Sequence, residues 1–297
     1  MGALTAIGVI GVGGMGGGIV SLLLASGKQV VVLGHRNRAP IEAAVGRGAA
    51  EAGSPQALAK ACDTILLCVR DAEAAESTVA RLAPHLRAGS LLIDLGTAPP
   101  EVPRRLHARL AKGGVAFAEA PLAGGVQQAE EGSLGALVGA EPEVFARAAP
   151  ILDVFCATVE HFGPPGSAAT AKLLNNFMVM GMVALIAETF NRAEAAGIDW
   201  RKLYSVAIRG AGDSAALRRI VEPALEGDFG GYVFGISDAA KDLRYIRSLA
   251  EGMGGMSPLG QAVEQVFGAA VAHGHGDRRV SELIAPDVRT GSGTGSD

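Results

Sequence analysis

The sequence is poor in the residues that mark disulfide frameworks, zinc sites and nucleic-acid-binding surfaces. It has three cysteines in 297 residues, and the spacing of Cys62, Cys68 and Cys156 fits neither a disulfide framework nor a zinc site. Its 26 Lys and Arg against 30 Asp and Glu give a net charge of −4, without the basic excess that nucleic-acid binding usually needs. We therefore expect a protein of a reducing compartment that has no nucleic-acid partner.

The sequence also lacks the signals of a secreted or membrane protein. No Lys or Arg precedes Lys28, which argues against the basic start of a signal peptide. The longest apolar run, Phe177–Ala187, is shorter than the roughly 20 residues that span a bilayer. A hydrophobic content of 49% against 19% charged residues excludes a globally disordered chain. We expect a cytoplasmic globular protein with no membrane partner.

In the first half of the chain, apolar runs of strand length alternate with segments of helical composition. The runs contain almost no polar residues, which is typical of strands buried on both faces of a parallel sheet. They are Ala6–Ile10, Val30–Leu33, Thr64–Val69, Leu91–Leu95 and Val115–Phe117. The helical segments between them are Gly14–Ser26, Ala39–Arg47, Ala72–Leu82 and Pro100–Ala111. This alternation predicts an α/β fold with a doubly wound parallel sheet.

The second half of the chain has few strand-like runs. A long helical stretch, Ser167–Ala196, ends before Gly197, a plausible C-cap. The later helical segments are Trp200–Arg209, Ser214–Glu226, Ser237–Glu251, Pro258–His273 and Val280–Ile284. We predict a sheet domain at 1–165, an all-helical domain at 166–289 joined to it by the long helix, and a disordered tail at 290–297.

A glycine-rich loop follows the first apolar run. Gly11, Gly13 and Gly16 form a G-x-G-x-x-G between a predicted strand and a predicted helix. Gly11 permits a tight turn, Gly13 a close approach of a pyrophosphate, and Gly16 close packing of helix on strand. The alternative is a glycine-rich turn without a ligand. We predict a Rossmann-type dinucleotide-binding domain, with Gly14 and Met15 also at the cofactor.

The end of the second predicted strand indicates which dinucleotide binds. An NAD site usually has Asp or Glu there for the ribose 2′-hydroxyl, but the first acidic residue is Glu42. His35, Arg36, Asn37 and Arg38 stand in its place. A guanidinium can bind a 2′-phosphate bidentately, so we predict NADP(H), with Arg36 as the main contact. The alternative is a solvated basic loop.

A lysine and an asparagine lie on one face of the long predicted helix. Lys172 and Asn176 are four residues apart, and Val179, Val183 and Ala187 continue the same face. Two polar residues at the start of an apolar face are unusual in a packing helix. A partly desolvated lysine has a lowered pKa, which suits acid–base chemistry near neutrality. A lysine that extends from the helix edge into water is the alternative.

Four segments together resemble the β-hydroxyacid dehydrogenases, which include 3-hydroxyisobutyrate dehydrogenase and tartronate semialdehyde reductase. Gly11–Gly16 is similar to the family's N-terminal signature, and Glu119–Gly125 to its substrate motif, usually D-A-P-V-S-G-G. Gly163–Asn176 resembles G-x-x-G-x-G-x-x-x-K-x-x-x-N, and Phe234–Leu243 resembles the segment that ends in K-D-L. The resemblance extends from about residue 7 to residue 284.

The resemblance implies roles for individual residues. Lys172 would be the catalytic acid/base, and Asn176 would help to hold the substrate. Gly124 and Gly125 would present backbone N–H groups to a substrate carboxylate. Lys241 would reach substrate and cofactor from the helical domain. The family's activity is hydride transfer between nicotinamide and a small β-hydroxy acid or its semialdehyde, carried out by a homodimer or homotetramer.

Two further cofactor contacts are expected at strand ends, and the chain departs from the family pattern at three positions. Val69 ends an apolar run, and Thr97 would line the nicotinamide side. Ala123 stands at a substrate-binding position where the family usually has serine, and loss of its hydrogen bond would cost about 1–3 kcal/mol. Glu119 for aspartate and Ala168 for glycine are milder departures.

Two alternatives to the dehydrogenase remain open. An imine reductase-like NADPH enzyme shares the architecture but usually has Asp or Tyr at the position of Lys172. A catalytically silent NADP-binding module would explain Ala123. No metal is expected, because His273 and His275 form a histidine pair without a third ligand nearby in the sequence.

Overall fold

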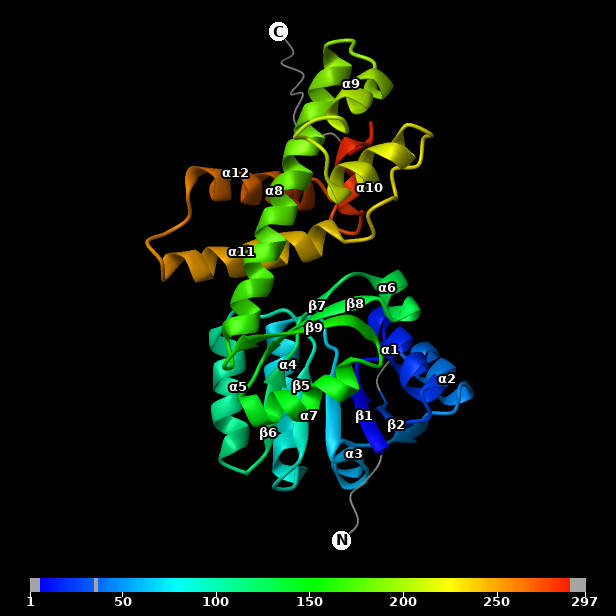
Figure 1. The fold of residues 1–297 in the computed structure, drawn as a ribbon, viewed down its shortest axis with the longest axis vertical. Helices are drawn as coiled ribbons and strands as arrows, with labels where there is room; N and C mark the ends of the chain where they lie inside the picture. Colours follow the sequence, from blue (N-terminus) through cyan, green and yellow to red (C-terminus); the bar gives the residue numbers. More distant parts are fainter. Residues whose placement is uncertain (1–5, 35–36, 289–297) are drawn as a thin grey trace. The chain divides into compact units, whose positions relative to one another are not determined.

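The computed structural model describes residues 6–34 and 37–288, and the chain divides into two compact units, Met1–Lys172 and Leu173–Asp297. The predicted class, a Rossmann-type α/β sheet followed by an all-helical region, is confirmed (Figure 1). The domain boundary at 165/166 remains a prediction. The predicted tail at 290–297 lies outside the described residues, as do His35 and Arg36.

The first unit is built on one sheet, which has nine strands in the described part of the chain. The strands are β1 (Ala6–Ile10), β2 (Gln29–Leu33), β3 (Ala50–Ala52), β4 (Thr64–Leu67), β5 (Leu91–Asp94), β6 (Ala116–Glu119), β7 (Leu122–Ala123), β8 (Leu134–Gly139) and β9 (Cys156–Gly163). Their order is β3-β2-β1-β4-β5-β6-β8-β7, and β9 pairs with β8. The pairs from β3 to β6 are parallel, whereas β8 runs antiparallel to β6 and β7.

Helices cover both faces of this sheet (Figure 1). Successive side chains of a strand point to opposite faces, so Leu66 packs in the core formed with α1, α2 and α7, while Ile65 and Leu67 pack in the core formed with α3, α4 and α5. The helices are α1 (Gly14–Ala25), α2 (Ala39–Gly46), α3 (Pro55–Ala61), α4 (Ala72–Leu82), α5 (Glu101–Ala111), α6 (Val126–Glu131) and α7 (Pro142–Leu152), with the 3₁₀ helix η1 (Ala83–His85). Apolar side chains on both faces explain why the parallel strands lack polar alternation.

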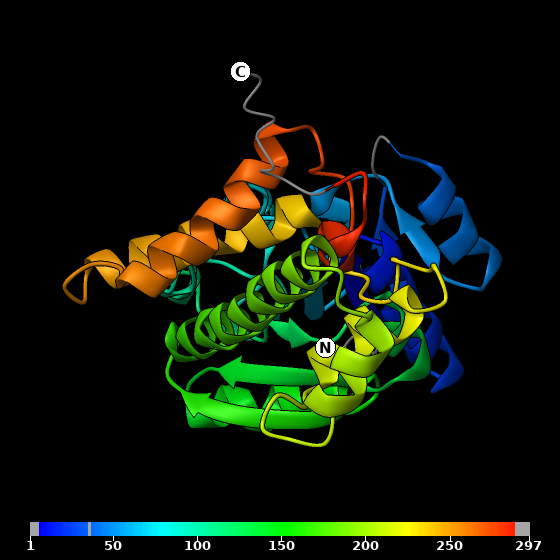
Figure 2. The same ribbon diagram turned by 90° about the horizontal axis from the view of Figure 1, so that it is seen from above.

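The second unit is helical in its described residues. Its elements are α8 (Ser167–Ala195, which begins in the first unit), α9 (Trp200–Ala207), α10 (Ala215–Ala224), α11 (Ile236–Glu251), α12 (Pro258–Ala272) and the 3₁₀ helix η2 (Val280–Ile284). α11 and α12 lie side by side in both views (Figures 1 and 2). Phe190 of α8 and Phe267 of α12 are fully buried in one apolar core. Burial of the apolar helix faces against one another holds this unit together.

Helix α8 also has the length and composition of a membrane span. It has 29 residues, and the mean hydropathy of its most apolar 18-residue window is 1.5. Within that window 44% of the residues are buried inside the structure, and the central helix of a soluble protein has the same properties. The apolar content of α8 is therefore weak support for a membrane segment, and buried residues such as Leu173, Val183 and Phe190 belong to the helical core.

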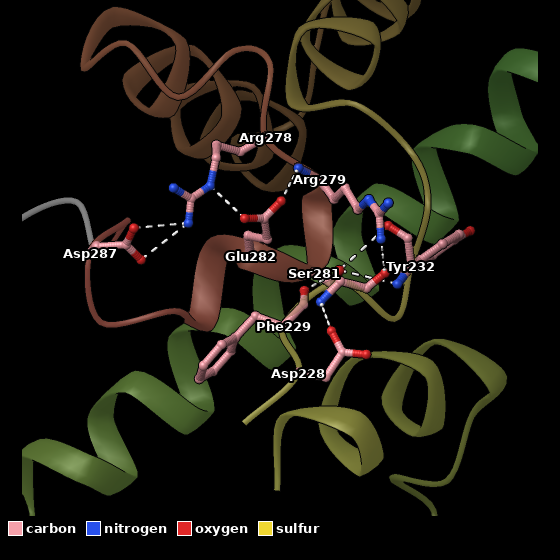
Figure 3. A network of polar contacts seen from close by, with 9 residues as sticks. Asp228, Phe229, Tyr232, Arg278, Arg279, Ser281, Glu282 and Asp287 are labelled. Carbon is pink, nitrogen blue, oxygen red and sulfur yellow. Dashed lines mark hydrogen bonds and ion pairs between the residues drawn. The ribbon is translucent and has the colours of Figure 1, made fainter. Parts of the chain in front are cut away.

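A network of polar contacts fixes the chain just before α11 (Figure 3). The Ser281 hydroxyl is fully buried, donates to the Phe229 carbonyl at 2.7 Å and accepts from the Tyr232 N–H at 3.1 Å. The Arg279 guanidinium donates to the Gly230 carbonyl at 2.7 Å. These contacts join η2 to the loop that leads into α11, the helix that carries the predicted substrate-binding lysine.

Candidate active site

The carboxyl ends of four parallel strands bring most of the predicted site residues of the first unit to one edge of the sheet. β1 is hydrogen-bonded to β4, β4 to β5 and β5 to β6 as parallel neighbours. The glycine loop follows β1, Val69 follows β4, Thr97 follows β5, and Ala123–Gly125 follows β6. In open α/β sheets this edge is where ligands bind. The first unit thus places these four predicted segments along one edge.

Glycine stands at the three positions of the loop for different physical reasons. Gly11 has a φ of 92°, and a Cβ there would lie 2.0 Å from the Cys68 carbonyl oxygen. A Cβ on Gly16 would lie 1.9 Å from the Gly11 carbonyl oxygen. A Cβ on Gly13 would meet no atom within 4 Å. Gly11 and Gly16 are therefore required by the fold, whereas the space at Gly13 is open to a ligand.

Helix α1 presents its first N–H groups without a side-chain cap. Gly13 is the N-cap, and no side chain accepts a hydrogen bond from the first turn. The N-terminus of a helix attracts phosphate through free N–H groups and the positive end of its dipole. The open Gly13 and the uncapped helix start fit the pyrophosphate of a dinucleotide.

The second predicted motif packs directly on α1. A Cβ on Gly14 would lie 2.8 Å from the Val126 side chain, and one on Gly18 would lie 2.8 Å from the Ala129 backbone. Glycine at these two positions lets α6 approach α1 closely. The structure therefore brings the start of α6, directly after Gly125, next to the glycine loop, although the two motifs are far apart in the sequence.

The Ala123–Gly125 segment offers fewer free donors than its sequence suggests. The Gly125 N–H donates to the Gln128 side-chain oxygen at 2.9 Å, which closes the start of α6. Gly124 is exposed and has a φ of 123°, a conformation that favours glycine. Ala123 is half-buried in β7 opposite Gly135 of β8. Of the two glycine N–H groups expected to face a substrate, the one of Gly125 already has a partner.

Arg38 is engaged in an ion pair. Its guanidinium donates to both carboxylate oxygens of Glu51, at 2.7 and 2.9 Å, and lies 3.7 Å from Glu42. Asn37 is exposed. Glu51 comes from β3, which pairs with β2, and it was not predicted from the sequence. A bidentate contact between Arg38 and a 2′-phosphate would have to replace this pair.

Glu119 is a buried carboxylate at the carboxyl end of β6, and its role was not predicted. Its side chain is 3% exposed, and its Oε1 accepts the N–H of Gly166 at 2.6 Å and that of Ala168 at 3.0 Å. Burial raises the pKa of the Glu119 carboxyl to about 7, although these N–H groups act in the opposite direction. Glu119 thereby ties the edge of the sheet to the start of α8.

Asp94 at the end of β5 is a second buried carboxylate that sequence analysis missed. It accepts the Gly96 N–H at 3.0 Å and so shapes the turn before Thr97. Burial raises the pKa of the Asp94 carboxyl to about 6. An acidic residue at the end of an apolar run was visible in the sequence, and its position at a strand end was the signal that could have identified it.

Lys172 lies in the second turn of α8 and is 8% exposed. Ala168, whose N–H is bound by Glu119, is four residues earlier and therefore one turn below it on the same helix face. The predicted alternative, a lysine that extends into water, does not agree with this burial. The helix start that carries Lys172 is attached to the same sheet edge as the glycine loop.

The other predicted polar residues belong to the second unit. Asn176 is 8% exposed and donates to the Asp242 carboxylate at 2.6 Å. Lys241 of α11 lies 3.5 Å from the same carboxylate and 5.9 Å from the ring centre of Tyr245. Asp242 is 2% exposed and was not predicted as a site residue. It joins the two predicted substrate-binding residues, Asn176 and Lys241.

No group of three His, Cys, Asp or Glu side chains that could hold a metal ion is found in the ranges 6–34 and 37–288. The Nδ1 atom of His273 donates to the Ala269 carbonyl of its own helix at 2.7 Å. The candidate site of the first unit contains a glycine loop, backbone N–H groups and the buried Lys172 and Glu119 side chains. Such a set fits a nucleotide cofactor and a small polar substrate.

Family models match almost the whole chain. Residues 6–163 match the model described as the NAD binding domain of 6-phosphogluconate dehydrogenase. Residues 166–286 match the model described as NAD-binding of NADP-dependent 3-hydroxyisobutyrate dehydrogenase. The fold and the sheet-edge site thus define an NAD(P)-dependent oxidoreductase. More particularly, the chain belongs to the β-hydroxyacid dehydrogenase family, as its motifs predict.

Individual relatives are similar over nearly their full length. L-Threonate dehydrogenase of Cupriavidus necator is 28% identical, with 94% of each chain covered. The structure of Mycobacterium tuberculosis 3-hydroxyisobutyrate dehydrogenase with L-serine has a TM-score of 0.86 and 26% identity, and covers 95% of this chain and 98% of that one. The structure of Psf3 with NADP+ and 2-OPP has a TM-score of 0.84 and 29% identity, with 94% and 98% covered.

Proposed function

We propose that this enzyme transfers hydride between NADP(H) and a small β-hydroxy acid or its semialdehyde, with Lys172 as the acid/base. The observation that carries the proposal is the burial of Lys172 in the second turn of α8, whose start is fixed to the sheet edge by Glu119. Lysine is seldom buried unless a partner or a function requires it. Small hydroxy acids are named in relatives, as in L-threonate dehydrogenase.

The glycine loop would hold the cofactor. Gly13, Gly14 and Met15 would contact the pyrophosphate with the first N–H groups of α1, within the turn that Gly11 and Gly16 make possible. Val69 and Thr97, at neighbouring strand ends, would line the nicotinamide side. When bound, the nicotinamide supplies or accepts the hydride.

Lys172 would exchange a proton with the substrate oxygen. In the oxidation direction its neutral amine takes the proton of the substrate hydroxyl, and in the reduction direction its ammonium returns one. Ala123, Gly124 and Gly125 would lie along the substrate carboxylate. Since the Gly125 N–H is bound by Gln128, the Gly124 N–H is the donor of this pair that would face the substrate.

In the second unit, Asn176 and Lys241 are the proposed substrate-binding residues, and Lys241 is also a proposed cofactor contact. Asp242 accepts the Asn176 N–H at 2.6 Å and thereby sets which way the amide points. The amide oxygen of Asn176 is then the atom that can accept a hydrogen bond from a substrate hydroxyl.

We infer a preference for NADP(H) over NAD(H) from the basic sequence after β2 and from the lack of an acidic residue in the sequence before Glu42. His35, Arg36, Asn37 and Arg38 remain the proposed 2′-phosphate contacts. Because Glu51 already holds Arg38, Arg36 should contribute more of the discrimination. Fluorescence titration with NADPH and NADH tests this, and a preference for NADH would refute it.

The assembly proposed is a homodimer or homotetramer in the cytoplasm. Leu174, Met178 and Leu185 of α8 are 53%, 59% and 68% exposed, which leaves an apolar stripe on a long helix. A second copy of the chain would cover it. The three cysteines are free thiols in the structure, which agrees with a reducing compartment.

The acid/base role is tested by Lys172→Ala. We expect kcat to fall by about two to four orders of magnitude, the usual contribution of a general acid–base group. Lys172→Arg is the matched control, because arginine keeps the positive charge but does not give up its proton near neutral pH. NADPH affinity should stay within about twofold in both variants. An unchanged kcat in Lys172→Ala would show that another group moves the proton.

A second candidate, an imine reductase-like activity, is favoured by Ala123 where the family usually has serine. A panel of β-hydroxy acids, semialdehydes and cyclic imines, followed by the absorbance of NADPH, separates the two activities. Turnover of imines alone would support the second candidate. Binding of NADPH without any turnover would instead indicate a catalytically silent module.

A further inference from the structure

We propose that Glu119 is a positioning residue for Lys172: its carboxylate fixes the first turn of α8 and thereby sets where the lysine amine lies. This inference rests on the proposed function, since it assigns Glu119 a part in the same reaction. Glu119 does not touch the substrate in this proposal. It acts through the helix backbone.

The contacts that carry the proposal are short and shielded from water. Oε1 of Glu119 accepts the Gly166 N–H at 2.6 Å and the Ala168 N–H at 3.0 Å. Glu119 is 3% exposed, and Ala168 is fully buried. Lys172 lies one helical turn above Ala168, so a shift of the first turn moves Lys172 as well.

The start of α8 depends on this carboxylate. The first four N–H groups of any helix lack partners within the helix, and a side-chain oxygen near the helix start often accepts one of them. The first turn of α8 contains no acidic residue of its own. The chain enters it through Gly166, whose φ of 99° favours glycine. A carboxylate from β6 therefore serves as the cap for a helix in another part of the chain.

The sheet has made room for the longer glutamate side chain. Gly139 of β8 is the register partner of Glu119. A Cβ on Gly139 would lie 2.1 Å from the Oε1 atom of Glu119 and 2.8 Å from its Cδ atom. The three atoms nearest to that Cβ all belong to Glu119, so the space at Gly139 serves this side chain. The family motif usually has the shorter aspartate at this place.

The proposed consequence concerns the chemical step rather than cofactor binding. Proton transfer requires the amine within hydrogen-bond reach of the substrate oxygen. A misplacement of about 1 Å can lower the rate by about 100-fold. Loss of the cap should therefore lower kcat, while the glycine loop, at the end of a different strand, keeps its affinity for NADPH.

Three variants of the full-length enzyme test this. Glu119→Ala removes the cap, and we expect kcat to fall by about 10- to 100-fold with NADPH affinity within about twofold. Glu119→Gln keeps an acceptor oxygen and should recover most of the loss. Gly139→Ala keeps the Glu119 carboxylate in the protein, but the added methyl group displaces it. This variant should lower kcat as Glu119→Ala does. Addition of Gly139→Ala to Glu119→Ala should then have no further effect.

Asp199→Ala is the matched control for the loss of a helix cap. Asp199 accepts the Lys202 N–H at 3.1 Å at the start of α9 and has no part in the proposed site. This variant should lose stability and keep kcat. If Glu119→Ala does not fold, Glu119→Gln and Gly139→Ala still test the proposal.

The Lys172→Ala background separates this proposal from the proposed function. If Lys172→Ala lowers kcat and Glu119→Ala has no further effect in that background, Glu119 acts through Lys172. If Glu119→Ala lowers kcat by the same factor in the parent and in Lys172→Ala, or leaves kcat unchanged in the parent, the positioning role is wrong and the proposed function stands. If Lys172→Ala retains full activity, the proposed function itself fails.

Discussion

Glu119→Gln should change how the stability of this protein depends on pH. Burial raises the pKa of the Glu119 carboxyl from 4.5 to about 7, and the N–H groups of Gly166, Ala168 and Ala169 lower it by less. Because the pKa is higher in the folded chain, the folded chain holds the proton more tightly than the unfolded chain between these two values. The contribution of Glu119 to the free energy of unfolding is therefore fully present below pH 4.5 and is lost as the pH rises to about 7.

The size of the effect follows from the two pKa values. Each unit of difference corresponds to about 1.4 kcal/mol, so a rise from 4.5 to about 7 corresponds to about 3 kcal/mol. Glutamine has nearly the same shape and an acceptor oxygen but cannot ionise. The free energy of unfolding of the parent, minus that of Glu119→Gln, should fall by about 3 kcal/mol between pH 4 and pH 8.

Urea denaturation of both proteins at each pH unit from 4 to 8 measures this difference. Circular dichroism is the suitable signal, because the single tryptophan, Trp200, lies in the second unit. Asp94→Asn gives a comparison at a second buried carboxyl, whose charge also contributes to the raised pKa of Glu119. Burial raises the pKa of Asp94 from 3.8 to about 6. The difference in free energy of unfolding between the parent and Asp94→Asn should therefore decrease at a pH about one unit lower than for Glu119→Gln.

A slope of the opposite sign would contradict this prediction. If the difference between parent and Glu119→Gln rises with pH, the pKa of Glu119 lies below 4.5 in the folded chain. The N–H donors and the dipole of α8 would then outweigh the cost of burial. A flat difference would mean that the two contributions cancel.

Three further predictions concern packing, the second unit and assembly. Gly18→Ala should destabilise by about 1–3 kcal/mol, since its Cβ would lie 2.8 Å from the backbone of α6, whereas Gly17→Ala, whose nearest contact is 3.6 Å away, should not destabilise in thermal unfolding. Asp242→Ala should cost about 1–3 kcal/mol, because it leaves the buried Asn176 amide without its acceptor, and Asp242→Asn should recover part of this in urea denaturation. Leu185→Glu, at a position that is 68% exposed, should shift the mass measured by light scattering toward the monomer; an unchanged mass would place the interface elsewhere.

The strands that were predictable from the sequence are those buried on both sides. The runs that became β1, β2, β4, β5 and β6 were predicted because strands covered by helices on both faces are apolar throughout. β3 and β7–β9 were not predicted. β9 has mostly exposed or half-buried residues, and β7 has two residues, so neither has the pattern of a buried strand.

The candidate site was predictable where it depends on local conformation. The loop needs glycine because of a positive φ and because its backbone lies close to other backbone atoms. Both requirements can be recognised from the spacing of glycines between a strand and a helix. The partners of the charged residues were not predictable. Arg38 finds Glu51 thirteen residues away, and Glu119 finds Gly166 across 47 residues, through pairing and placement of strands.

The alternation of strands and helices, the glycine loop and the family can be recognised from the order of residues alone. Local sterics and the burial of apolar runs decide these features within a few neighbouring residues. The tertiary structure alone decided that Glu119 binds the start of α8, that Gly139 leaves room for it, and that Asp242 holds Asn176. These contacts join segments that come together only after the sheet or the helical core has formed. No local sequence pattern therefore encodes them.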